Sequence, residues 1–132
     1  MSNTQTVQEI YAAFGSGDIP AILSKLSPSV DWEYGSASTS VPWLQHRRGP
    51  EEVAGFFESL GGIDMHSFAP KEILESGNVV VALIDVDFTV KSTGKRVTEE
   101  DEIHVWRFDD AGKVVKLRHG ADTHAHQLAR GA

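Results

Sequence analysis

The chain has 132 residues, the size of one domain, and its 40% hydrophobic content is ordinary for a globular protein. A formal net charge of −7 offers no basic surface for nucleic acid, and no apolar run reaches the length needed to cross a membrane. The lack of cysteine excludes disulfides, thiolate metal ligands and thiol nucleophiles, and we expect a cytoplasmic protein without a cofactor.

Two helices are predicted in the first quarter of the chain. Apolar residues follow a helical spacing from Thr4 to Ser16, and the glycines that come next end this helix. Asp18 is a typical N-cap for the second helix. The predicted buried stripe of this helix ends at Leu26, and Pro28 closes it.

The next part of the chain predicts a short strand, a long loop and a third helix. The strand covers Val30 to Tyr34, and a loop rich in Ser, Thr, Pro and Gly follows from Gly35 to Gly49. Loops of this length are often functional. The run Gly49-Pro50-Glu51-Glu52 begins the third helix, because proline suits the first helical position and acidic residues suit the positive end of the helix dipole.

Strands dominate the second half of the chain. We expect them at about Ile63–Glu75, Asn78–Lys91, Arg96–Phe108 and Lys113–Ala121, followed by a short helix at His124–Ala129. His124 and His126 in that helix are expected to be solvated. Helices followed by antiparallel strands are typical of an α+β fold with the helices on one face of a curved sheet. No linker or repeat interrupts the sequence, so we expect a single domain over residues 1–132.

The closing hairpin carries the strongest functional signal. If Phe108 pairs with Lys113, the alternation of strand side chains brings six residues to one face. They are Glu102, His104, Trp106, Val115, Leu117 and His119. Two imidazoles and a carboxylate would be costly in a plain core, because each buried polar group costs free energy unless it is hydrogen-bonded. The sequence therefore predicts a pocket, with His104 opposite Leu117 and Glu102 opposite His119.

The preceding strand adds a second carboxylate to this prediction. If Lys91 pairs with Arg96, Asp85 falls opposite Glu102, on the face of His104. Two facing carboxylates would raise the pKa of one of them, as a general acid or base requires. The alternative is that this end of the sheet is solvated and the charges only cover its surface.

Two segments resemble a known superfamily. The run IHVWRFDDAGKVVKLRHGAD (103–122) is similar to the last two strands of the cone-shaped domains shared by ketosteroid isomerases, nuclear transport factor 2-like proteins and SnoaL-like polyketide cyclases. The run VQEIYAAFGSGDIPAILSKLSPSVDWE (7–33) is similar to their opening. The resemblance implies a cone-shaped, curved sheet, antiparallel or mixed, with three helices packed on its concave face and enclosing a cavity. It also implies a homodimer, which the outward apolar residues Ile103, Val105 and Val114 support.

The resemblance also implies roles for residues of the hairpin. His104 takes the position where ketosteroid isomerases carry a protonated Asp that donates to an oxyanion, and His119 takes a position that lines the cavity. The cyclases combine a His with an acid/base Asp on these strands. Here the second position holds His119, so the acid is either missing or supplied by Glu102 or Asp122, although Asp122 also fits a helix N-cap.

The isomerase's own catalytic groups are not kept. The catalytic Tyr on the isomerase's first helix aligns with Ile10 of this chain, and Tyr11 lies one position further, about 100° round the helix. The isomerase's general-base Asp aligns near Tyr34. An epoxide hydrolase-like site, in which Arg118 and acids surround a water, ranks third, because strand parity turns Arg118 away from His104.

Large apolar side chains are expected to wall the cavity. The predicted ligand-binding residues are Trp32, Tyr34, Trp43, Phe57, Trp106 and Leu117. Aromatic residues would suit an ordinary core equally well. His104, His119 and Glu102 have the composition of a two-His-one-carboxylate metal set, but nothing in their spacing requires an ion, and we expect none.

Two classes of function remain open. In the first, a SnoaL-like protein binds a small apolar molecule and acts as an isomerase or cyclase by acid/base chemistry at a carbonyl near His104, with His119 or Glu102 moving the proton. In the second, the domain only binds a ligand or serves as an accessory dimer. A clear carboxylate base in the pocket would favour the first class.

Overall fold

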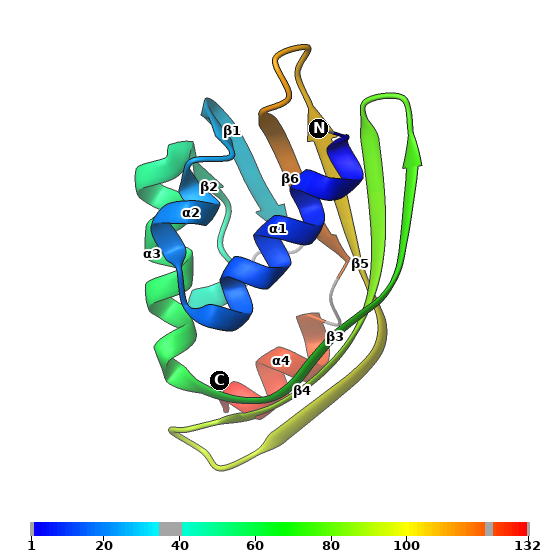
Figure 1. Ribbon diagram of the computed structural model, residues 1–132. Coiled ribbons are helices and arrows are strands. Elements are labelled where there is room, and N and C mark those ends of the chain that lie inside the picture. The colour runs from blue at the N-terminus through cyan, green and yellow to red at the C-terminus, as the bar shows by residue number, and fades with distance from the viewer. Residues whose placement is uncertain (1, 35–40, 121–122, 132) are drawn as a thin grey trace.

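The computed structural model describes residues 2–34, 41–120 and 123–131 (Figure 1). The first half holds α1 (Asn3–Ser16), α2 (Ile19–Leu23), β1 (Leu26–Tyr34), the 3-10 turn η1 (Pro42–Leu44), β2 (Arg47–Arg48), α3 (Gly49–Ser59) and the 3-10 turn η2 (Leu60–Gly62). The second half holds β3 (Ile63–Ser76), β4 (Val79–Val90), β5 (Arg96–Phe108), β6 (Val114–Gly120) and α4 (Thr123–Arg130). Among all the described residues, no helix is long and apolar enough to span a membrane.

The strands form one mixed sheet in the order β2-β1-β6-β5-β4-β3. β1 and β6 run parallel, and the other neighbours are antiparallel. The sheet is strongly curved; α1, α2 and α3 lie on its concave side, and α4 lies where the long strands bend (Figure 1). The predicted α+β fold, a curved mixed sheet with three main helices, is confirmed.

The predicted end of the second helix is wrong. α2 ends at Leu23, and Leu26 and Pro28 belong to β1, where Leu26 pairs with Val114 of β6. The pairing of β1 with β6 is irregular between Leu26 and Asp31. Proline has no N–H for a strand ladder, and such an irregular stretch is where a strand tolerates it. Pro28 therefore lies inside a strand and does not close a helix.

The closing hairpin is shifted by two residues from the predicted register. His104 lies opposite His119, and Trp106 lies opposite Leu117. The turn explains the shift, because the Asp109 carboxylate accepts the N–H groups of Ala111 and Lys113 while the Asp109 N–H donates to the Lys113 carbonyl. A shift of two residues keeps Glu102, His104, Trp106, Leu117 and His119 on their predicted face.

A bulge changes the parity at the turn end of the hairpin. The register slips between Arg107 and Phe108, so that Phe108 faces Val114. Val114 is therefore buried and Val115 half-buried, the reverse of the prediction. Val114 accordingly contributes to the core and not to the outer face of the sheet.

The predicted pair of facing carboxylates is absent from the β4–β5 ladder. The register slips between Ile84 and Val86, and Glu102 faces Ile84. Asp101 takes up the extra length with a positive φ of 61°. The slip turns Asp85 to the outer surface, where its carboxylate accepts the Asp101 N–H and lies 2.9 Å from Nζ of Lys71. Asp85 therefore has no part in the site, and the expectation that it faces Glu102 was wrong.

Candidate functional site

The helices and the inner face of the sheet border a cavity of about 80 Å³. One water needs roughly 10–15 Å³ on the same measure, so the cavity has room for several waters or one small molecule. Most of its wall is apolar, formed by Ile10, Phe14, Ile22, Trp32, Trp43, Leu44, Phe56, Phe57, Leu60, Ile63, Met65, Phe68, Val86, Phe88, Trp106 and Leu117. Its polar lining residues are Tyr11, Glu102, His104, His119 and His126.

A chain of hydrogen bonds joins α1 to the sheet through Tyr11. The indole Nε1–H of Trp106 lies 3.0 Å from the Tyr11 hydroxyl and donates to it, because an indole has only a donor to offer. The same hydroxyl lies 2.8 Å from Nδ1 of His104. Burial raises the pKa of the Tyr11 phenol, the Trp106 hydrogen bond opposes this, and the negative charge of Glu102 adds to the rise. The phenol therefore keeps its proton and remains a hydrogen-bond donor.

Glu102 lies on the other side of the His104 ring. Its Oε1 is 3.8 Å from Nε2 of His104, and both side chains are buried, at 10% and 6% exposure. This separation permits charge attraction but is too long for a hydrogen bond. Tyr11 and Glu102 thus flank one imidazole, each near a different nitrogen.

His119 is the second imidazole of the site. Its ring centroid is 4.6 Å from that of His104, in an edge-to-face arrangement. Nδ1 lies 3.4 Å from the backbone carbonyl of Glu33, which can only accept, so Nδ1 carries the proton of the neutral ring. Burial and the nearby His104 lower the pKa of His119 well below its usual value. The lone pair of the neutral ring is then on Nε2.

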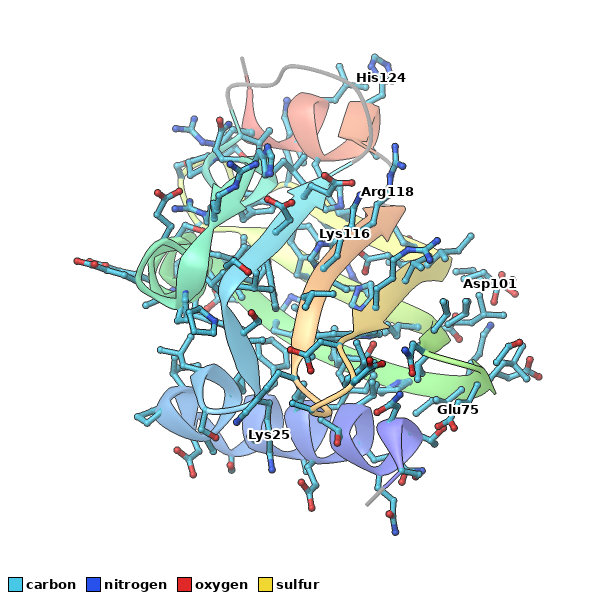
Figure 2. All side chains as sticks on the ribbon, turned by 90° about the horizontal axis from the view of Figure 1, so that it is seen from above. Lys25, Glu75, Asp101, Lys116, Arg118 and His124 are labelled. Carbon is cyan, nitrogen blue, oxygen red and sulfur yellow. The ribbon has the colours of Figure 1, made fainter. Side chains whose placement is uncertain are left out.

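A second buried polar chain runs from η1 through α4 to β5. The Trp43 Nε1–H lies 3.0 Å from Nδ1 of His126 and donates to it, and Nε2 of His126 contacts the Glu99 carboxylate. His126 is only 5% exposed and packs edge-to-face on Phe88. The expectation that His126 is solvated was therefore wrong, whereas His124 on the other side of α4 points outward (Figure 2).

The predicted site residues fall into three groups. Glu102, His104, Trp106, Leu117 and His119 meet in the cavity, and Trp32, Trp43 and Phe57 line it with them. The side chain of Tyr34 and the whole of Asp122 lie outside the described residues, so their predicted roles stay untested. Arg118 points to the outer surface, with Nε 3.8 Å from Glu33, as strand parity predicted. In the described ranges no three His, Asp or Glu side chains are grouped so that they could hold a metal ion.

Tyr11, like His126, is a polar lining residue that sequence reasoning did not assign to the site. It belongs to the apolar stripe of α1 with Val7, Ile10 and Phe14, and its ring packs against Phe68 with centroids 5.7 Å apart. A tyrosine on a buried helical stripe needs a partner for its hydroxyl. That requirement was the available signal, but it does not identify His104 as the partner.

We expect His126→Leu to destabilise the fold by about 3 kcal/mol. The substitution removes the acceptor of the Trp43 indole N–H, and it removes the imidazole N–H that the buried Glu99 carboxylate accepts. His124→Leu is the matched control, since this side chain is exposed on the same helix, and should change the stability by less than about 0.5 kcal/mol. Urea unfolding measures both values. Equal stabilities for the two variants would contradict the assignment of His126 to a buried chain.

Comparisons with known proteins agree with this architecture. Residues 7–117 match the sequence profile of the SnoaL-like domain. An NTF2-like protein of unknown function from Burkholderia pseudomallei is 32% identical, with both chains covered completely and a TM-score of 0.86. One from Burkholderia thailandensis is 26% identical over 100% of this chain and 99% of its own, with a TM-score of 0.87. TerC, co-crystallized with polyporic acid, is 25% identical over 98% of each chain, with a TM-score of 0.81. The curated proteins contain no match.

Proposed function

Since the chain belongs to the SnoaL-like domain family, whose fold alone does not determine a reaction, we propose a function from the site itself. The protein binds a small, largely apolar molecule that carries a carbonyl group, and it moves a proton next to that carbonyl by acid/base catalysis. The observation that carries this proposal is the Tyr11–His104 pair beside the neutral imidazole of His119, inside an apolar cavity. The crystallization of the relative TerC with polyporic acid supports a small organic ligand. The cytoplasm remains the expected location.

In the proposed reaction, Tyr11 is the electrophilic partner of the substrate. Its hydroxyl donates to the carbonyl oxygen and strengthens that bond as negative charge develops on the oxygen, since the apolar wall weakens charge screening. The Trp106 indole polarises the phenol by donating to its oxygen. When Tyr11 turns to the substrate, its hydroxyl leaves Nδ1 of His104, while the Trp106 indole keeps its hydrogen bond to the phenol oxygen.

His119 is the proposed base. In the neutral state Nε2 accepts the proton from the carbon next to the carbonyl and returns it to another carbon of the enolate, so no proton is lost overall. This is the step of an isomerase or of a cyclase that begins with an enolate. The low pKa of His119 keeps the ring in the required neutral form at neutral pH.

A second candidate function is binding without catalysis. The observation that favours it is the outward position of Asp85, which leaves the described cavity without the pair of carboxylates predicted from the sequence. In that case the same polar groups would only orient the ligand.

Binding tests the proposed role of Tyr11 through two ligands of similar size. Acetophenone has a carbonyl and ethylbenzene does not, so Tyr11→Phe should weaken acetophenone binding about tenfold and alter ethylbenzene binding less than about twofold. Ethylbenzene thus also reports whether the variant keeps its cavity. All three tryptophans of the chain line the cavity, and their fluorescence can follow both titrations. Equal effects on the two ligands, or no uptake of either by the parent protein, would contradict the proposal.

Proton transfer is measured on the same ketone. In D₂O the parent protein should accelerate deuterium exchange of the acetophenone methyl protons, followed by NMR, and His119→Gln should abolish the acceleration while ketone is still bound. If acetophenone binds but its methyl protons exchange only at the rate measured in buffer, the protein binds its ligand without catalysis.

We further propose that the protein is a homodimer through the outer face of the sheet. Aliphatic side chains gather there on neighbouring strands and include Leu74, 61% exposed, Ile103, 41% exposed, and the half-buried Val81 and Val105. Such a patch is unfavourable in water and suits a second copy of the same surface. Light scattering should give about twice the chain mass of 14.4 kDa, and Ile103→Lys should return the monomer. A parent protein that is monomeric at tens of micromolar would refute this proposal.

A further inference from the structure

Glu102 is a buried carboxylate that faces the cavity without a hydrogen-bond donor from the described residues. The side chain is 10% exposed, and Nε2 of His104 lies 3.8 Å from it, too far for a hydrogen bond. Glu99, on the same strand and equally buried, provides the contrast, because its carboxylate contacts Nε2 of His126. One strand thus places two carboxylates inward, and Glu102 is the one directed at the space that a ligand would fill.

A carboxylate in this position favours one kind of ligand group. It accepts several hydrogen bonds and donates none, and it is costly to bury when those bonds are missing. A hydroxyl or phenol on the ligand would supply a charge-assisted hydrogen bond, roughly twice as strong as a neutral one. A ligand carboxylate or phosphate would instead be repelled by the like charge in an apolar wall.

Building on the proposed function, we infer that the ligand is a hydroxylated ketone, whose carbonyl oxygen accepts from Tyr11 and whose hydroxyl donates to Glu102. The two polar ends lie on opposite sides of the His104 ring, because Tyr11 contacts Nδ1 and Glu102 faces Nε2. Aromatic walls such as Trp32, Phe57 and Trp106 hold the apolar body between them. The site therefore selects neutral molecules with an acceptor at one end and a donor at the other.

Four related ketones test the inference: acetophenone, 3′-hydroxyacetophenone, 4′-hydroxyacetophenone and 4′-methoxyacetophenone. Calorimetry gives the dissociation constant of each for the parent protein. The better hydroxy isomer should bind at least about tenfold more tightly than acetophenone. The methoxy compound, which has no hydrogen-bond donor, should bind no more tightly than acetophenone. In Glu102→Gln the ratio of the dissociation constants of acetophenone and the hydroxy isomer should fall toward one.

Glu100→Gln is the matched control, because it removes the same charge from an exposed position on β5 and should keep the ratio of the parent. If acetophenone binds but neither hydroxy isomer binds more tightly, the inference is wrong and the proposed function stands. If the hydroxy isomer still binds more tightly than acetophenone in Glu102→Gln, or if this preference is lost equally in Glu100→Gln, the role of Glu102 is refuted. If none of the ketones binds, the proposed function fails and the inference falls with it.

Discussion

The structure depends on the cost of burying polar groups inside an apolar wall. A buried donor or acceptor without a partner costs about 1–3 kcal/mol, so each one restricts where its neighbours can lie. The Trp106–Tyr11–His104 chain fixes α1 across the concave face of the sheet, because only there does the Tyr11 hydroxyl reach Nδ1 of His104. The Trp43–His126–Glu99 chain fixes η1 and α4 to β5 in the same way. Two hydrogen-bonded chains therefore join helices to sheet on either side of one cavity.

The same constraint gives the cavity its chemistry. Burial raises the pKa of Tyr11 and lowers that of His119, so that a proton donor and a neutral imidazole both lie next to His104. In water an imidazole of ordinary pKa would be partly protonated near neutral pH. The aromatic wall is thus part of the proposed mechanism as well as of the core.

How far the sequence predicts this site can be argued from single residues. The alternation of β5 and β6 correctly placed Glu102, His104, Trp106 and His119 on the inner face, and a register error of two residues did not disturb that placement. The prediction for Asp85 failed because a bulge changes which side chains face inward, and the residue types in the sequence do not show where a bulge lies. Tyr11 and His126 were missed for a different reason. Their partners His104 and Trp43 are 93 and 83 residues away in the chain, so the hydrogen bonds exist only in the folded protein.

The central claim is that the cavity holds a neutral imidazole, His119, ready to accept a proton. A long-range ¹H–¹⁵N NMR spectrum of the histidine side chains between about pH 5 and 8 tests it directly, because the nitrogen shifts report both the charge and the tautomer of each ring. The account predicts that His119 stays neutral, with its proton on Nδ1, over the whole range. A His119 that becomes charged within this range, or that carries its proton on Nε2, would contradict the account.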